Sequence, residues 1–131
     1  MTSFEMAIRN RGIAGSLRYD ERFGLGSDRF TLGEENELMN RARRLGLTAR
    51  FFPIVITAHP GLTSGRRAAD DPKALAAHGA VIALDYPHSW PLRIPLKAWR
   101  DKRARLAPFW GAIIHGFRGA FWIHCAYRLQ K

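Results

Sequence analysis

Two segments of the chain contain continuous apolar runs of the kind found in buried strands. Residues 50–57 (RFFPIVIT) and 80–84 (AVIAL) are rich in β-branched and apolar residues and lack polar alternation. A strand buried on both faces of a parallel sheet has this pattern. Because loop residues and a short helical segment separate the two runs, we expect a strand, helix, strand unit with a right-handed crossover. The predicted fold class is α/β, a small parallel or mixed sheet flanked by helices, with strands near 51–57, 80–85 and 112–115.

Helix start and stop signals place a first helix before these strands. Thr31 and Glu34 have the spacing of a capping box, and residues 34–45 place apolar side chains at helical spacing before Gly46. The sequence therefore predicts a helix over 34–45. Residues 1–30 are interrupted by glycines and predict only irregular structure or short strands.

Two further helices are indicated after the first apolar run. Asp71 stands before a proline, which is a typical helix N-terminus, and Gly79 suits a left-handed stop. The pattern predicts a short helix over 73–78 between them. Residues 96–106 follow a proline-containing loop and are predicted to form a basic helix.

The last segment, residues 109–129, permits two interpretations. As one continuous helix it would place Ala112, Gly116 and Ala120 in a line of small residues, along which a neighbouring helix packs closely. Alternatively, 112–115 is a third strand, followed by a tight turn and a second helix. Three glycines destabilise a continuous helix by roughly 1 kcal/mol each relative to alanine, which favours the split interpretation.

Composition indicates a folded chain of one domain. The chain has 131 residues, of which 47% are hydrophobic, enough to form a core of ordinary size. We expect a single domain over 1–131, with an α/β core over 31–131. Cys125 is the only cysteine, which excludes a disulfide scaffold. Met1–Asn10 lacks the apolar run of a signal peptide, so the expected location is cytoplasmic.

The charge is concentrated in the last third of the chain. The formal net charge is +10, and residues 93–131 contain nine basic residues against Asp101 alone. Basic residues interspersed with Trp90, Trp99 and Trp110 are typical of a surface that neutralises phosphates and stacks on bases. As an alternative to an enzyme, this pattern predicts a non-enzymatic binding protein that contacts nucleic acid, an acidic protein or an anionic lipid surface through residues 93–110. The candidate anion-binding residues are Arg93, Lys97, Arg100, Lys102, Arg103 and Arg105.

Residues 107–127 are also long enough to cross a bilayer. Arg118 lies at the centre of this stretch, where an arginine costs roughly 2.5 to 3.5 kcal/mol on insertion scales. A helix that lies in the membrane interface, with its basic residues toward anionic headgroups, fits the sequence better. The abundance of Phe and Trp also suggests a homo-oligomer or a larger complex.

Three segments follow one another along the chain: FPIVITAHPGLTSGRR, KALAAHGAVIALDYP and AIIHGFRGAFWIHCAYRL. Together they resemble the N-terminal half of the α/β-hydrolase superfamily over residues 48–131. The resemblance implies an ester or amide hydrolase, or a non-catalytic relative. It places His59 and Gly61 in an oxyanion loop, where backbone N–H groups stabilise the developing charge. It places His115 and Gly116 in the nucleophile elbow, with Gly116 where the family has its serine.

A second enzymatic alternative uses three other residues. His78, Asp85 and His124 are similar to the zinc ligands of small peptidoglycan-cleaving endopeptidases of the endolysin type. Two imidazoles and one carboxylate leave an open zinc position at which bound water becomes acidic. Zinc is expected only under this alternative, and otherwise no cofactor is expected.

Overall fold

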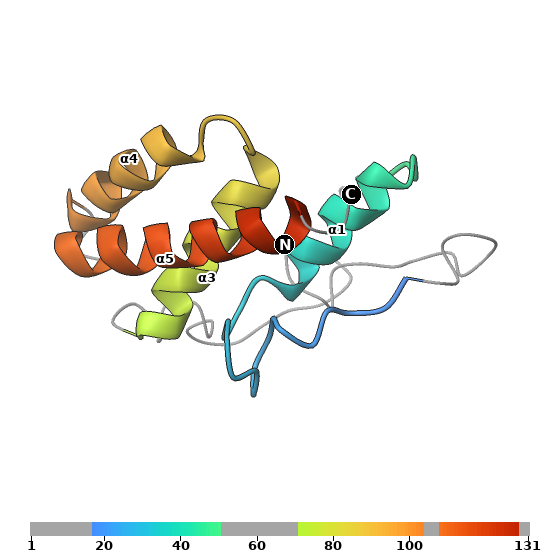
Figure 1. Ribbon diagram of the computed structural model, residues 1–131, viewed down its shortest axis with the longest axis horizontal. Helices are drawn as coiled ribbons and strands as arrows, with labels where there is room; N and C mark the ends of the chain where they lie inside the picture. Colours follow the sequence, from blue (N-terminus) through green and yellow to red (C-terminus); the bar gives the residue numbers. More distant parts are fainter. Residues whose placement is uncertain (1–16, 51–70, 104–107, 129–131) are drawn as a thin grey trace.

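Helices form the part of the chain that the computed structural model describes, residues 17–50, 71–103 and 108–128 (Figure 1). Strand pairing in this part is limited to an isolated bridge between Phe23 and Phe30. The predicted α/β class is therefore wrong, because the segments at 80–85 and 112–115 are helical. The predicted strand at 51–57 lies outside the described residues. The helices are α1 (Glu34–Arg44), α3 (Pro72–Asp85), α4 (Trp90–Arg103) and α5 (Phe109–Arg128).

Helix α3 begins where the sequence predicts it but does not stop at the predicted residue. The Asp71 side chain accepts hydrogen bonds from the backbone amides of Lys73 at 3.0 Å and Ala74 at 3.3 Å. Such a cap stabilises a helix by about 1 kcal/mol. The helix then continues through Gly79 to Asp85. Gly79 lies inside the helix, where it faces Gly116, and does not end the helix in a left-handed conformation.

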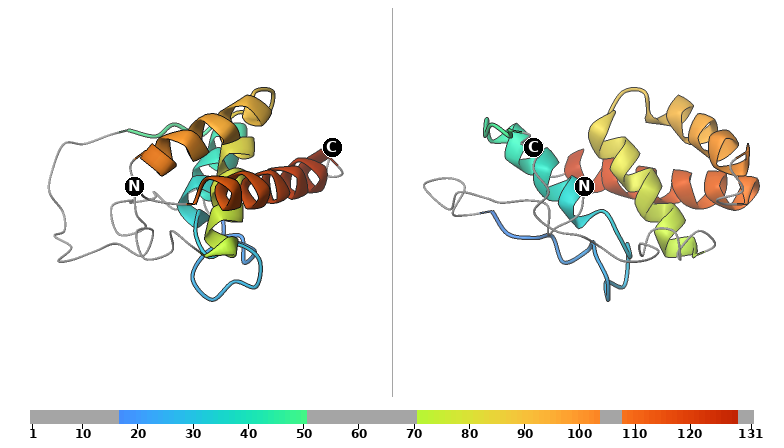
Figure 2. Two further views of the ribbon diagram at one scale, coloured as in Figure 1. Left: turned by 90° about the vertical axis from the view of Figure 1, so that its left-hand side faces the viewer. Right: turned by 180° about the vertical axis from the view of Figure 1, so that it is seen from behind.

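The apolar run at 80–84 is helical because α3 is the central helix of the fold. It contacts α1, α4 and α5, and the views of Figures 1 and 2 show these helices arranged around it. A helix enclosed by neighbours is apolar on all sides, so its sequence lacks the polar alternation that would reveal its period. Its buried residues include Ala74, Ala77, Ala80, Ala83 and Leu84.

Helices α3 and α5 touch backbone to backbone. A Cβ atom added at Gly79 would overlap the carbonyl oxygen of Gly116, and one added at Gly119 would overlap that of Ala76. Helices approach this closely only where both have small residues. The line of small residues in α5 therefore packs as the continuous-helix interpretation predicts, and the split interpretation, with its strand at 112–115, is wrong. Tight packing compensates for the low helix propensity of the glycines.

Helix α1 begins at the predicted residue, Glu34, and ends at Arg44, one residue before its predicted end, but the predicted capping box does not form. Gly33 precedes the helix with φ +97°, and no side chain caps the N-terminus. Thr31 is not part of a capping box, because its hydroxyl donates to Asp71 at 3.0 Å. This bond ties the segment before α1 to the start of α3. A side chain at Gly33 would press on Val81 of α3, so glycine suits both the φ angle and the space.

Polar side chains join α1 to α3 and to the end of α5. The Glu37 carboxylate is 1% exposed and accepts hydrogen bonds from Arg41 at 2.7 Å and from the Tyr127 hydroxyl at 2.6 Å. Asn40, also buried, donates to Asp85 at 2.5 Å. A buried carboxylate is tolerated when its lone pairs are satisfied in this way. These contacts fix α1 against the other helices.

An aromatic cluster packs the segment before α1 onto α5. The rings of Phe23 and Phe30 lie 4.8 Å apart, and Phe30 meets Trp122 of α5 edge to face at 5.6 Å. Both phenylalanines are buried. The short strands expected in residues 1–30 are replaced, in the described part, by this cluster and its single bridge.

Candidate anion-binding surface

The residues assigned by the hydrolase resemblance do not form a nucleophile elbow. His115 and Gly116 lie within α5, where neither the strand nor the sharp turn of an elbow is present. Gly116 is buried against Gly79 and Ile94, and its Cα faces the neighbouring helices. His59 and Gly61 lie outside the described residues, and their proposed role stays a prediction. The physical basis for a hydrolytic site at 112–116 is therefore lost.

The three residues of the zinc alternative are not brought together. His78 and Asp85 are seven residues apart on α3, which separates them by about 10 Å along the helix axis. His124 packs beside the Trp90 ring, with ring centroids 6.1 Å apart. Within 17–50, 71–103 and 108–128, no group of three or more His, Cys, Asp or Glu residues is placed to hold a metal ion.

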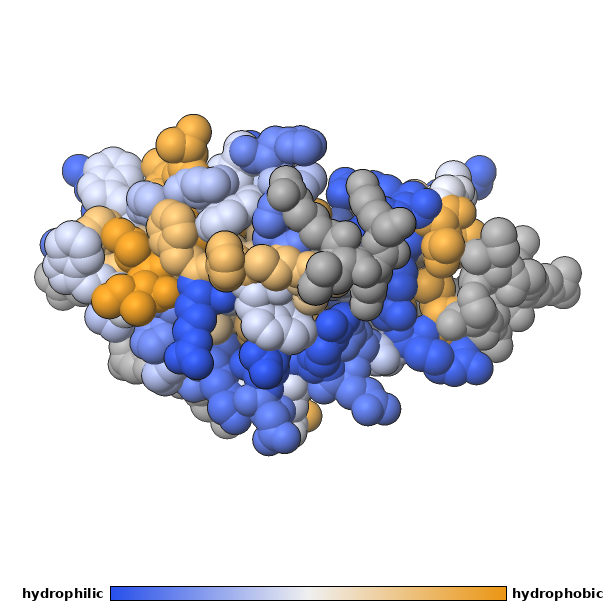
Figure 3. Space-filling view, viewed as in Figure 1, coloured by the Kyte–Doolittle hydropathy of each residue, from blue (hydrophilic) through white to orange (hydrophobic). Residues whose placement is uncertain are grey.

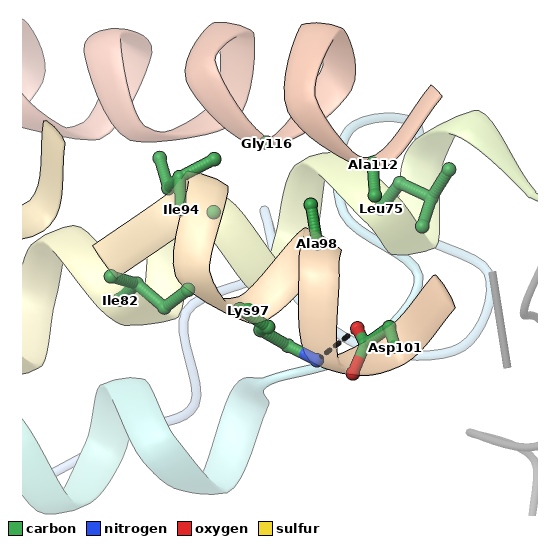
Figure 4. A pocket seen from close by; sticks show the side chains of 9 residues that line it. Leu75, Ile82, Ile94, Lys97, Ala98, Asp101, Ala112 and Gly116 are labelled. Carbon is green, nitrogen blue, oxygen red and sulfur yellow. Dashed lines mark hydrogen bonds and ion pairs between the residues drawn. The ribbon is translucent and has the colours of Figure 1, made fainter. Parts of the chain in front are cut away.

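A cavity between α3, α4 and α5 is too small for an organic substrate. Its volume is about 10 Å³, roughly the space for one water molecule. Figure 4 shows the Lys97–Asp101 ion pair at this cavity, with an Nζ to Oδ2 distance of 2.6 Å. Gly116 and Ile94 are among its other lining residues. The contact among these three helices is thus closed by packing.

His78 is a titratable group that this packing affects. Burial lowers the pKa of its imidazole, and the nearby Lys97 cation lowers it further, while Asp101 acts in the opposite direction. The neutral form is favoured because a charged imidazole would lose its hydration between the helices. His78 is therefore part of the α3–α4 contact.

The cations predicted to bind anions lie mainly on the exposed side of α4. Arg105 is outside the described residues, and Lys97 is half-buried and paired with Asp101. Asp101 is the only acidic residue in α4 and α5, so this pair removes the one carboxylate that would offset the remaining cations. The exposed cations of α4 are Arg93, Arg100, Lys102 and Arg103.

Aromatic rings hold three of these cations at the surface. The Arg103 guanidinium lies 4.2 Å from the centroid of the Trp99 ring, and the Lys102 ammonium lies 5.6 Å from that of Phe109. The Arg93 guanidinium lies 3.6 Å from the Tyr86 ring. Cation–π contacts at exposed sites contribute about 0.5 to 1 kcal/mol each and leave the charge accessible.

The outward face of α4 is apolar between these cations. Leu92, Leu96 and Trp99 are exposed and follow each other at helical spacing, opposite the buried Ile94 and Ala98. At 3.6 residues per turn, Arg93 and Arg100 lie on one side of this stripe and Lys102 on the other. An exposed stripe opposite the buried one is unusual for a surface helix.

Helix α5 has a matching stripe. Trp110, Ile114 and Phe121 are 70%, 61% and 64% exposed, opposite the face that includes Gly116 and Ile123. The exposed cation Arg118 lies at one edge of the stripe by helical geometry. In Figure 3 hydrophobic residues follow α5 across the front face, with further ones over α4 and hydrophilic ones below. We call this surface the outer apolar face: Leu92, Leu96, Trp99, Trp110, Ile114 and Phe121.

Most of this surface was not predicted from the sequence. Trp99 and Trp110 were predicted as binding residues, but so was Trp90, which packs inside against Phe117 at 5.7 Å. Leu92 and Leu96 were missed, although their spacing from Trp99 gave a signal. Detecting it requires that Ile94 and Ala98 be known as the buried face of α4.

Comparisons with known proteins give no relative, because no family model, curated protein or solved structure matches the chain. Among the described helices none is long and apolar enough to cross a membrane.

Proposed function

We propose that this protein is a non-catalytic binding protein that attaches to a partner bearing many phosphate groups, through the exposed cations of α4 and α5. The observation behind the proposal is the segregation of charge on these helices. Arg93, Arg100, Lys102, Arg103 and Arg118 are exposed. The one carboxylate among them belongs to Asp101, which is paired with Lys97.

This segregation favours polyanions over single anions. Separate cations spread along two helices form a positive field that attracts a row of phosphates and releases their counterions on contact. Each contact is weak, so binding depends on several of them together and weakens with added salt. Guanidinium groups suit this task because they remain charged and bind phosphate oxygens in pairs.

The packing among α3, α4 and α5 also supports binding at their surface rather than chemistry between them. The cavity beside Lys97 has room for about one water molecule. His78, on α3, has its pKa lowered by burial, which favours the neutral imidazole. The cations, in contrast, are outside and accessible.

A charge-reversal experiment tests the proposal. Arg100→Glu with Arg103→Glu is compared with Arg50→Glu with Lys73→Glu, which changes the net charge by the same amount at exposed positions elsewhere. Binding of a fluorescent single-stranded oligonucleotide and of phosphatidylglycerol vesicles is measured over a salt series. On at least one probe, we expect the first variant to bind at least about tenfold more weakly and the second to change much less. Equal losses of affinity in both variants, or wild-type binding that does not weaken as the salt concentration rises, would contradict the proposal.

A further inference from the structure

We infer that the anionic partner is a lipid bilayer surface, and that α4 and α5 lie in its headgroup region along the outer apolar face. This inference rests on the proposed function and specifies its partner. The cations explain attraction to phosphate, but they do not explain why large apolar side chains between them are exposed. Leu92 is 79% exposed and Trp110 is 70% exposed.

A bilayer is the phosphate-bearing partner that uses both kinds of residue. Transfer of leucine, isoleucine and phenylalanine side chains from water to the acyl boundary lowers the free energy, while arginine and lysine remain among the headgroups. Tryptophan is favoured at the boundary itself. A nucleic acid would use the cations and stack on Trp99 and Trp110, yet it would leave Leu92, Leu96 and Ile114 in water.

A second copy of this chain fits the surface less well. In a symmetric dimer the same patch meets itself, so the exposed cations of one copy would face those of the other. Asp101 is the only carboxylate on α4 and α5, and it is already paired with Lys97. Like charges would then meet without compensation, whereas anionic lipid supplies the opposite charge.

The fold determines how deeply these helices enter the bilayer. The face of α5 opposite to Trp110 is fixed on α3 through Gly116 and Gly119, where backbones touch. Only the outward face is free to enter lipid, and Arg118 at its edge stays at headgroup level. Helix α4 has the same arrangement, with Arg93 and Arg100 beside its stripe. Both helices therefore lie in the plane of the interface, as amphipathic surface helices do.

Vesicle binding distinguishes this inference from its alternatives. Sedimentation with vesicles of pure phosphatidylcholine is compared with vesicles containing about 30% phosphatidylglycerol. We expect binding to the anionic vesicles alone, with a blue shift of tryptophan emission as Trp99 and Trp110 leave water. Circular dichroism checks that each variant remains folded.

Matched serine variants separate apolar insertion from charge attraction. Ile114→Ser with Phe121→Ser keeps every cation, and we expect it to bind anionic vesicles at least about tenfold more weakly. The control, Leu25→Ser with Leu45→Ser, removes exposed leucines that lie outside the outer apolar face. This variant should bind anionic vesicles as the wild type does. Binding of the oligonucleotide should be the same in both variants.

Four results would overturn the inference. Salt-sensitive binding to the oligonucleotide without binding to vesicles would leave the proposed function standing and exclude the lipid surface. Undiminished vesicle binding by Ile114→Ser with Phe121→Ser would assign the attraction to charge alone. A wild-type dimer in light scattering that this variant dissociates, without vesicle binding in either, would show that a second copy covers the face. Failure of both probes would reject the proposed function as well.

Discussion

The two faces of α5 differ in almost every physical respect. The inner face has glycine and alanine, because the backbone of α3 lies where side chains would be. The outer face has Trp110, Ile114 and Phe121, all more than half exposed. One helix thus combines a contact that admits no additional atom with a surface that buries little of its apolar area. The difference shows that the fold depends on the inner face, whereas the outer face is exposed to solvent.

The largest expected effect comes from adding a methyl group to the inner face. Gly79→Ala or Gly119→Ala would place Cβ in contact with a backbone carbonyl of the facing helix. A backbone carbonyl cannot relieve this overlap by changing rotamer, as a side chain could. Overpacking of this kind costs about 3 kcal/mol, which exceeds the gain in helix propensity of about 1 kcal/mol. We expect a net loss of about 2 kcal/mol or more in the free energy of unfolding, measured by urea denaturation.

Gly111→Ala is the matched control for this substitution. It lies on α5 too, but its added Cβ would meet only side-chain atoms, Leu75 at the ordinary contact distance of 3.7 Å and Pro108 at 3.3 Å, where a shift of a few tenths of an ångström relieves the contact. The variant should be as stable as the wild type or slightly more stable. If Gly119→Ala were as stable as Gly111→Ala and the wild type, α3 and α5 would not touch backbone to backbone.

A smaller effect is expected at the C-terminal end of α5, where its inner side is held by a polar contact. Tyr127→Phe removes the hydroxyl that donates to Glu37, while Arg41 continues to donate to that carboxylate. The loss of a hydrogen bond to a buried charge should lower the free energy of unfolding by about 1.5 kcal/mol. Tyr19→Phe, at an exposed position, should have no effect. Equal stability of both variants would contradict the role of Glu37 as an anchor.

The same tyrosine makes stability dependent on alkaline pH. Burial, and next the hydrogen bond to Glu37, raise the pKa of Tyr127 above its ordinary value. A raised pKa means that the folded state keeps the proton up to a higher pH than the unfolded chain does. The contribution of protonated Tyr127 to the free energy of unfolding is therefore complete below about pH 10 and is lost as the pH rises further. Wild-type melting temperatures should fall more steeply than those of Tyr127→Phe in that range.

The sequence predicted those parts of the fold that depend on local chemistry. Asp71 was identified as a helix cap because its side chain satisfies the amides of the next turn, whatever the rest of the chain does. The end of α1 followed from its apolar spacing before Gly46. The small-residue line of α5 was also visible, although the helix propensity of its glycines favoured the wrong interpretation.

The remaining errors have one physical cause. A run such as 80–84 fits a buried strand and a central helix equally well, because both are apolar on every side. Which one forms depends on whether Gly79 meets another backbone, and that partner lies in α5, far along the chain. The outer apolar face was only partly predicted for the same reason. An exposed leucine and a buried leucine look alike until the neighbouring helices are known.

Acidification should weaken the inner packing modestly, at the contact between α3 and α4. Because the pKa of His78 is lowered by burial, the unfolded chain binds a proton at a higher pH than the folded protein does. This contribution is complete above about pH 6.5 and is lost as the pH falls. The melting temperature of His78→Gln should therefore fall less than that of the wild type between neutral and mildly acidic pH. His88→Gln, at an exposed position, should behave as the wild type.

The smallest effect on folding is expected at the outer face. Ile114→Ser with Phe121→Ser removes side chains that are mostly in water, so each change should alter the free energy of unfolding by no more than about 0.5 kcal/mol. Urea denaturation in the absence of lipid measures this directly. A loss as large as that of Gly79→Ala would mean that these side chains are packed inside the protein.

Nuclear Overhauser spectroscopy of the protein tests the contact of α3 with α5 most directly. We expect a cross-peak between the Hα protons of Gly79 and Gly116, together with sequential amide cross-peaks through 80–85 and 112–115 that are typical of helices. Strand-type cross-peaks in either segment, or the lack of any contact between the two glycines in the folded protein, would contradict it.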